Sequence, residues 1–330
     1  MQQRSLRATK EKPDALPKVR KPKGDAKLMI WDGNWYIHRA HHGYGQYQRL
    51  TNKRGEDVTI LYGFLQMIGA DLLKYRPTHA VVVFDGDGSS KYRRDIYPEY
   101  KLNRHTEETA APVMYDQSMS ITEQISKIML TINQLGLSVM IHDGIEGDDL
   151  LGALVEKFFK RSKILVCTGD KDAAALVRPG VKLYNSQMKK LFDEDGIQER
   201  YGVMPNQMVD YLCLIGDSID NIPGCPQVGQ KNATRILAEY GSIDEAFKSG
   251  KEKRLTEWYK AKTGYRLAKK LITLRSDIKI NTGLDDLEIK RPEKDAREFL
   301  EFMGIRKPHE WFQEHLSGTR TLSLFGKKSK

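Results

Sequence analysis

The sequence is poor in cysteine and has no long apolar run. Its 330 residues include three cysteines, Cys167, Cys213 and Cys225, and two of them lie within apolar runs, which favours reduced core thiols over a disulfide framework. No stretch of about 18 apolar residues could cross a membrane, and the first residues lack the apolar core of a secretory signal. We therefore expect a cytoplasmic protein without a membrane partner.

Acidic residues are in the minority, 44 against 54 Lys and Arg, and the formal net charge is +10. Such a balance favours a polyanionic partner such as nucleic acid. The acids nevertheless gather after short apolar runs at five places. They are Asp32 in MIWDGN; Asp85 in VVVFDGD; Glu146, Asp148 and Asp149 in IEGDD; Asp170 and Asp172 in TGDKD; and Asp217 and Asp220 in IGDSIDN.

An apolar run followed by Asp is typical of the carboxyl end of a buried parallel strand, and these ends share one edge of a sheet, where ligands bind. Each group alone also has an ordinary explanation as a helix cap or a turn. A metal site explains all five at once. Since none of the eight histidines stands in an HxH or HExxH spacing, we expect two ions of Mg²⁺ or Mn²⁺ rather than zinc.

Strand-like and helix-like segments alternate through the first two thirds of the chain. Strands are predicted at 28–31, 79–84, 138–142, 163–167 and 181–184, with amphipathic helices at 60–73 and 121–135. This alternation predicts an α/β fold with a doubly wound, mostly parallel sheet. The expected domains are a disordered basic arm over 1–27, an α/β domain over 28–202, a helical region over 203–315 and a basic tail over 316–330.

Two segments interrupt the alternation. Residues 86–117 form a long passage in which Arg93, Arg94, Lys101 and Arg104 interleave with tyrosines such as Tyr100, a pattern suited to single-stranded nucleic acid. An exposed charged helix with inward tyrosines is the alternative. Further along, a Pro/Gly turn containing Gly224 and Gly229 opens a helix with Lys231, which could bind a phosphate or be a plain packing corner.

Together, YIHRAHHGYG, VFDGD, YRRDIYPEYKLNR, GIEGDD, TGDKDAAALV and LIGDSIDNIPG resemble the motifs of the 5′-nuclease family, in the same order, from about Leu28 to Ile280. That family includes the 5′–3′ exonuclease domain of bacterial DNA polymerase I, phage 5′ nucleases and flap endonucleases. The resemblance implies a metal-dependent phosphodiesterase that acts near 5′ ends of flapped, nicked or recessed DNA in replication or repair, with RNA–DNA hybrid primers as a further candidate substrate.

The resemblance also implies roles for particular residues. Asp32, Asp85, Glu146 and Asp148 would serve the first metal, and Asp149, Asp170, Asp172, Asp217 and Asp220 would serve the second or bridge the two. The 86–117 passage would be a helical arch in which Arg93 and Lys101 act with Asp85 in catalysis by steering the scissile phosphate, Arg94 and Arg104 add phosphate contacts, and Tyr100 stacks on a base. Residues 203–240 would be a helix-hairpin-helix-type element that grips duplex DNA through Gly224, Gly229, Lys231 and a K⁺ ion.

Two departures and one extra motif accompany this resemblance. Gln227 stands where the family has Gly, which puts the K⁺ site in question, and Gly147 replaces the usual Ala without expected harm. The tail peptide Leu322, Ser323, Leu324 and Phe325 resembles a sliding-clamp-binding motif. With no polymerase domain in the sequence, we expect a monomeric, free-standing nuclease; the alternatives are a PIN-type ribonuclease and a DNA-binding module that does not cleave.

Overall fold

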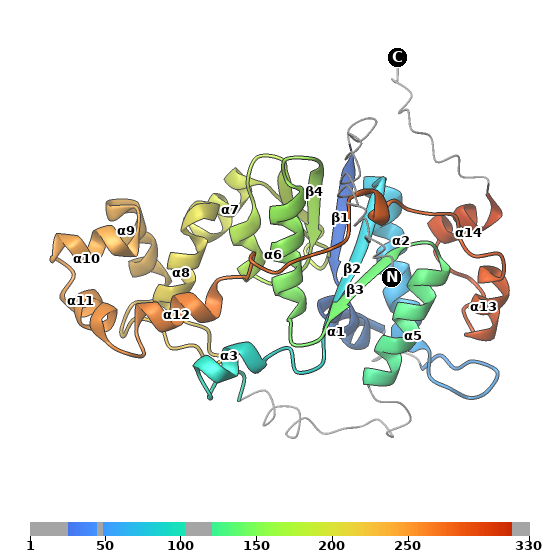
Figure 1. Ribbon diagram of the computed structural model, residues 1–330, viewed down its shortest axis with the longest axis horizontal. Helices are drawn as coiled ribbons and strands as arrows, with labels where there is room; N and C mark the ends of the chain where they lie inside the picture. The colour runs from blue at the N-terminus through green and yellow to red at the C-terminus, as the bar shows by residue number, and fades with distance from the viewer. Residues whose placement is uncertain (1–25, 45–48, 103–120, 319–330) are drawn as a thin grey trace, which may run out of the picture.

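The computed structural model describes residues 26–44, 49–102 and 121–318, and a six-stranded sheet lies at the centre of this part (Figure 1). The strands are β1 (Lys27–Asp32), β2 (His79–Asp85), β3 (Ser138–His142), β4 (Lys163–Cys167), β5 (Val181–Asn185) and β6 (Lys190–Phe192). Their order is β3-β2-β1-β4-β5-β6, with β1 to β5 parallel and β6 antiparallel to β5. The five predicted strands are confirmed. Among the strands of the described ranges, the short β6 is the one that was not predicted.

Both faces of the sheet are buried, which explains why its strands read as continuous apolar runs. In β1, Leu28 and Ile30 belong to one hydrophobic cluster and Met29 and Trp31 to the other. One face is covered by α1 (Gly33–Tyr44), α2 (Thr59–Tyr75) and α5 (Ile121–Gln134), and the other by α6 (Gly147–Phe158) and the 3₁₀ helix η1 (Asp172–Leu176). The predicted doubly wound α/β architecture is therefore confirmed.

The strand order places a reversal point beside β1. The chain runs outward from β1 to β2 and β3, and then returns to form β4 on the opposite side of β1. Helices that follow β1 and β3 consequently lie on opposite faces, and a crevice opens between the carboxyl ends of β1 and β4. This reversal is the place where a doubly wound sheet binds its ligand.

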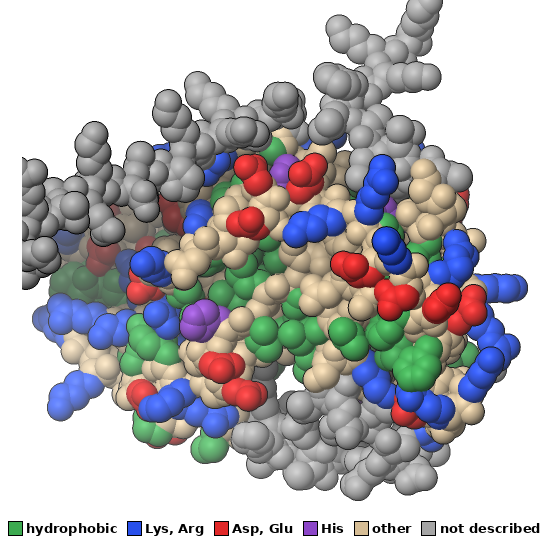
Figure 2. Space-filling view, turned by 45° about the vertical axis from the view of Figure 1, so that its right-hand side comes forward, with side chains coloured by type: hydrophobic (Ala, Val, Ile, Leu, Met, Phe, Trp, Pro, Cys, Tyr) green, Lys and Arg blue, Asp and Glu red, His purple; other side chains and the backbone are tan. Residues whose placement is uncertain are grey.

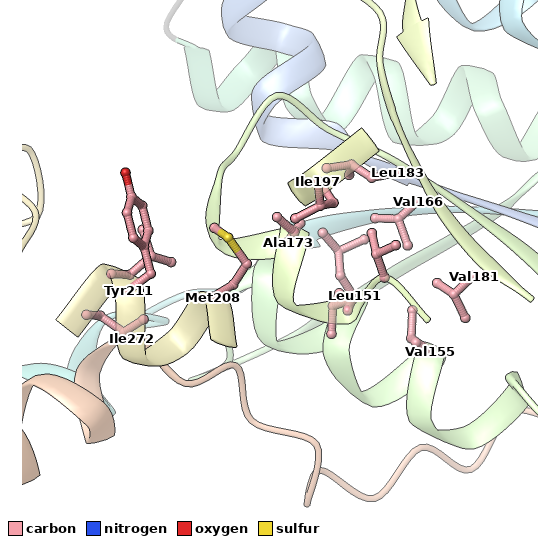
Figure 3. Close-up of a cluster of buried hydrophobic side chains, with 14 of the residues drawn as sticks. Leu151, Val155, Val166, Ala173, Val181, Leu183, Ile197, Met208, Tyr211 and Ile272 are labelled. Atoms are coloured by element: carbon pink, nitrogen blue, oxygen red, sulfur yellow. The ribbon is translucent and has the colours of Figure 1, made fainter. Parts of the chain in front are cut away.

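A helical region lies at one side of the sheet, at the left of Figure 1. After α7 (Glu194–Tyr201) and η2 (Pro205–Gln207), it consists of α8 (Met208–Ile215), α9 (Gln230–Tyr240), α10 (Ile243–Ser249), α11 (Lys253–Lys260) and α12 (Tyr265–Ile272). One hydrophobic cluster runs without interruption from α6 into α8 (Figure 3), where Leu151 and Ala173 are followed by Met208 and Tyr211. The two parts therefore share a core.

The last helices differ from the prediction that 203–315 is one helical region. Residues 285–287 form η3 (Asp285–Leu287), and then α13 (Ala296–Phe302) and α14 (Glu310–Ser317) pack on the α/β domain, at the right of Figure 1. Leu300 and Phe312 are buried in the cluster that contains α2, which explains this return. On this side of the molecule, hydrophobic side chains alternate with charged ones at the surface (Figure 2).

Three sequence predictions lie outside the described residues. They concern the basic arm up to residue 25, the part of the arch from residue 103 onward with Arg104, and the tail from residue 319 with the peptide Leu322 to Phe325. The predicted inner bounds of the arm and the tail are wrong by a few residues, because Lys27 already begins β1 and α14 continues to Ser317. The described beginning of the arch contains the short helix α3 (Lys91–Ile96). Within the described ranges, every helix is too short or too polar to span a bilayer.

Candidate active site

Four of the five acidic groups meet at the carboxyl edge of the sheet. Asp32 is the last residue of β1 and Asp85 the last of β2, Asp148 lies in the first turn of α6, and Asp170 follows β4. Burial raises the pKa of Asp148 well above its usual range, and the nearby charges of Asp170, Asp32 and Asp85 raise it further. The predicted convergence at this edge is therefore present in the structure.

Asp32 is held rigidly in the crevice between β1 and β4. Its Oδ1 accepts a hydrogen bond from the backbone N–H of Trp35 at 2.9 Å, and its Oδ2 accepts one from Thr168 Oγ1 at 2.7 Å. Burial raises the pKa of Asp32 to about 7, although both hydrogen bonds oppose this rise. Such a carboxyl group becomes fully ionised near neutral pH only when positive charge is supplied beside it.

Asp85 is the exposed member of the group. Its Oδ1 accepts a 2.6 Å hydrogen bond from the backbone N–H of Gly147, and its own N–H donates to Asn34 Oδ1 at 3.0 Å. A Cβ atom at Gly147 would lie 3.2 Å from Asp85 Oδ1. The glycine at this position therefore leaves slightly more room around Asp85 than an alanine would.

Glu146 does not behave as a helix cap. It occupies the N-cap position of α6, yet its side chain makes no capping hydrogen bond. Instead Glu146 Oε2 accepts hydrogen bonds from Lys101 Nζ at 2.9 Å and Tyr100 Oη at 3.3 Å. Its other oxygen, Oε1, is buried and has no hydrogen-bond partner among the described residues. A buried carboxylate oxygen of this kind fits a cation better than a structural role.

Asp170, Asp172 and Asp217 lie between the end of β4 and the helical region. Asp170 Oδ1 accepts a hydrogen bond from Asp172 N at 2.8 Å, and burial followed by the charges of Asp220 and Asp217 raises the pKa of Asp170. Burial also raises the pKa of Asp172. For Asp217, burial is outweighed by an ion pair with Lys171 at 2.8 Å, and its pKa is lowered.

The fifth acidic group does not follow a strand. Asp217 follows α8, and it closes a tight turn through reciprocal backbone hydrogen bonds with Ile222 of 2.8 and 2.7 Å. This turn places Asp220 Oδ2 3.3 Å from Tyr100 Oη. The helical region thus contributes acids to the same crevice, although the strand-end explanation is wrong for this group.

The site suits hydrated hard cations rather than a closed metal cage. Among the described residues, no three acidic, histidine or cysteine side chains are arranged to hold an ion as they stand. Mg²⁺ keeps several of its waters and needs only one or two protein carboxylates together with substrate phosphates. The all-oxygen donors, the raised pKa values of Asp32, Asp148 and Asp170, and the unpartnered Glu146 Oε1 fit such ions.

Three predicted residues lie in unexpected surroundings. Arg93 is only 2% exposed, and its guanidinium forms two hydrogen bonds with Asp149, at 2.7 and 2.8 Å. This geometry fits neither a phosphate contact for Arg93 nor a metal contact for Asp149. Tyr100 is also 2% exposed, so its ring has no free face for a base. At the described base of the arch, both Arg93 Nη1 and Lys101 Nζ approach Glu146 Oε2, at 3.4 and 2.9 Å, and Lys101 is the more exposed of the two.

In the turn before α9, the residue that departs from the family pattern has a positive φ. Gln227 adopts φ +61° in spite of its side chain, and Lys231 and Gly229 are exposed at the start of α9. Gly224 has a different role, because a Cβ atom there would lie 2.6 Å from Gly216 N. It lets the turn pack directly on the end of α8.

The sequence interpretation missed three residues that shape the site. Thr168 holds Asp32, Asn34 holds the backbone of Asp85, and Lys171 pairs with Asp217. Thr168 and Lys171 lie inside the TGDKD motif, where their spacing to the acids was the available signal. No comparable signal marks Asn34, because its contact depends on how α1 begins.

The doubly wound sheet, the acids at its reversal point and the adjoining helical region define a nuclease of the α/β type. Residues 27–202 match the family model for the 5′–3′ exonuclease N-terminal resolvase-like domain, and residues 203–295 match that for the 5′–3′ exonuclease C-terminal SAM fold. The chain belongs to the 5′–3′ exonuclease family, whose enzymes hydrolyse DNA phosphodiester bonds. A match over both domains sets aside the PIN-type ribonuclease.

Individual relatives agree with this membership. A 5′–3′ exonuclease from Aquifex aeolicus is 33% identical over 81% of this chain and 88% of its own length. DNA polymerase I from Pseudomonas aeruginosa is 30% identical over 82% of this chain, which spans 30% of the polymerase.

Solved structures share the fold. A bacteriophage T5 flap endonuclease variant in complex with DNA and metal ions has a TM-score of 0.61 at 17% identity, over 88% of this chain and 98% of that one. Flap endonuclease-1 from Methanococcus jannaschii has a TM-score of 0.56 at 16% identity, over 90% and 94%.

Proposed function

We propose that this 5′–3′ exonuclease uses two Mg²⁺ or Mn²⁺ ions to cut DNA near 5′ ends at flaps, nicks and recessed ends. The carboxylates that would hold the ions are Asp32, Asp85, Glu146, Asp148, Asp170, Asp172, Asp217 and Asp220. The observation that carries the proposal is Glu146 Oε1, which is buried and has no hydrogen-bond partner in the described part of the chain. It lies beside acids whose pKa values are raised. Bound ions would activate water and stabilise the leaving oxygen.

Other side chains of this protein could contact the phosphates of the DNA. Lys101 lies at the acids and partly in solvent, so its ammonium group can attract the scissile phosphate. The exposed Lys231 and the backbone around Gly229 at the start of α9 can hold a duplex phosphate without reading sequence. We include Arg94 among the phosphate contacts, and we leave Asp149, Arg93 and Tyr100 out of direct contact with metal or DNA.

The test uses purified protein with Mg²⁺ and 5′-labelled flap, nicked, blunt and single-stranded substrates. Asp85→Asn should abolish release of small 5′ products, while its Oδ1 can still accept the hydrogen bond from Gly147 N. Asp87→Asn is the matched control, because Asp87 is exposed two residues further on. Binding without cleavage by the unaltered protein would instead indicate the DNA-binding module, and the same substrates with 5′ RNA segments test hybrid primers.

We also propose a K⁺ ion at the turn that contains Gln227, since the positive φ is kept there. Stronger duplex binding in K⁺ than in Li⁺ at equal ionic strength would support this site, and equal binding would argue against it.

A separate proposal is that the tail peptide Leu322, Ser323, Leu324 and Phe325 binds a sliding clamp. Deleting 321–330 should remove clamp stimulation from a monomeric enzyme and leave its clamp-free activity intact; no binding of a sliding clamp by the full chain would refute it.

A further inference from the structure

Arg93 connects three segments that are far apart in the sequence. It belongs to α3 at the base of the arch, and its guanidinium forms a two-bond ion pair with Asp149 in the first turn of α6. Its Nε donates to the carbonyl of Leu271 at 2.8 Å, near the end of α12. Arg93 and Asp149 are 2% and 1% exposed, so the pair is shielded from solvent.

Asp149 makes the same connection from the other side. Its Oδ1 also accepts the backbone N–H of Arg275 at 2.9 Å, where the chain leaves the helical region. One turn further along α6, a Cβ atom at Gly152 would lie 3.2 Å from Leu274 Cβ. The segment after α12 is thus fixed directly onto α6, the helix whose N-cap residue is Glu146.

The pair lies immediately behind the acidic crevice. Glu146 Oε2 accepts hydrogen bonds from Lys101 and Tyr100, and it is also 3.4 Å from Arg93 Nη1. A small displacement of the end of α12 would therefore move the guanidinium and the first turn of α6 together. Planar Arg–carboxylate pairs are well suited to this, since two parallel hydrogen bonds fix both distance and orientation.

We propose that Arg93 and Asp149 form a positioning pair that couples the duplex-holding helical region to the acidic residues at the start of α6. Neither side chain contacts DNA or metal in this role. When a duplex is held at α9, the pair keeps α12, α3 and α6 in the single arrangement in which Glu146 and Asp148 face the scissile phosphate. The inference rests on the proposed function, because it needs a helical region that holds duplex DNA.

The experiment compares two 5′-flap substrates with the same flap, one with a long duplex arm and one with an arm too short to reach α9. The full-length protein should cut the long-arm substrate with a higher kcat/KM. In Arg93→Lys the positive charge remains, so Asp149 is not left as an unpaired buried charge, but one ammonium cannot reproduce the two parallel bonds and the bond to Leu271. We expect about a 100-fold loss on the long-arm substrate.

Activity of Arg93→Lys on the short-arm substrate should stay within about threefold of the unaltered protein, because the acids themselves are unchanged. Asp149→Asn should show the same loss that depends on the arm. Arg178→Lys is the matched control. Arg178 pairs with Glu156 near the other end of α6 at 3.0 Å, and this control should keep the full advantage of the long arm.

Each outcome separates the two proposals. If the unaltered protein cuts the long-arm substrate no better than the short-arm substrate, the helical region does not hold duplex DNA. That result would refute this part of the proposed function and would leave the role of the pair undecided by kinetics. The coupling is refuted if the long arm raises kcat/KM of Arg93→Lys as much as that of the unaltered protein. It is also refuted if Arg93→Lys loses the same factor of kcat/KM on both substrates. Amide exchange gives an independent measurement. Duplex binding should slow exchange of Arg275 N–H in the unaltered protein and in Arg178→Lys, and not in Arg93→Lys.

Discussion

Thr168 Oγ1 donates a 2.7 Å hydrogen bond to Asp32 Oδ2 and so joins the ends of β4 and β1 at the reversal point of the sheet. The bond favours the ionised carboxylate in a place where burial disfavours it. Thr168→Val keeps the shape of the side chain and removes the hydroxyl group, which donates to Asp32 and also accepts the backbone N–H of Asp170 at 3.0 Å. We expect the pKa of Asp32 to rise further, and the acid limb of the pH–activity profile to move up by about half a pH unit.

This shift is measured from kcat/KM between pH 5.5 and 9 with Mg²⁺. Thr168→Ser retains the hydroxyl group and serves as the control, since it should keep the original profile. An unchanged profile in Thr168→Val would show that ionisation of Asp32 does not limit the rate.

In the metal-free protein, protonation of the buried acids should add stability as the pH falls from 8 toward 5, while His41, His79 and His309, whose pKa values burial lowers, oppose part of this gain. Asp32, Asp148, Asp170 and Asp172 have folded pKa values above the unfolded value of 3.8, so the native state binds more protons than the unfolded state. The contribution of these four acids to the free energy of unfolding therefore falls as the pH rises from 3.8 through their folded pKa values, and the folded pKa of Asp32 is about 7.

Mg²⁺ should reverse this trend near neutral pH, because it binds the ionised carboxylates of the native state. Thermal unfolding at pH 8 with and without 10 mM Mg²⁺ checks this, and we expect a rise in Tm of about 4 °C or more. The rise should be small at pH 5, where protons compete with the metal. Equal shifts in Tm at pH 8 and pH 5 would contradict the proposal that the ionised carboxylates of the site bind Mg²⁺.

Lys101→Met should lower kcat by about 100-fold while the protein stays folded and binds duplex DNA. The physical reason is loss of the ammonium group that lies 2.9 Å from Glu146 Oε2, where we propose that it attracts the scissile phosphate. Lys91→Met is the control, since Lys91 lies on α3 and pairs only with Asp95 of the same helix in the contacts of the described chain. Equal losses in both variants would point to general charge rather than to the position of Lys101.

Gln227→Gly should strengthen duplex binding in K⁺ and leave flap cleavage on short duplex arms unchanged. Gln227 has φ +61°, a conformation that costs roughly 1 kcal/mol for a residue with a Cβ atom and little for Gly. Binding titrations in K⁺ and Li⁺ measure the effect. Gln230→Gly is a control for added flexibility, because Gln230 begins α9 with helical backbone. If both substitutions have the same effect, strain at Gln227 is not its source.

Much of the site was predictable because its positions repeat a local pattern. An apolar run that ends in Asp marks the end of a buried parallel strand, and Asp32 and Asp85 lie at such ends. The surroundings of Arg93 were not predictable. Its partners Asp149 and Leu271 are 56 and 178 residues away, and a basic, tyrosine-rich passage has the same local appearance whether its arginine points to solvent or to a buried acid.

The return of the chain after α12 limits how the helical region can move. The backbone leaves the α/β domain once at Gly202 and re-enters it at Thr273, after which Ile289 N is bonded to Thr78 O at 3.1 Å. A segment attached by two covalent crossings can rotate only about the line that joins them, whereas one attached by a single linker can turn in any direction. A single proteolytic cut in either crossing would therefore leave the helical region attached to the rest of the enzyme.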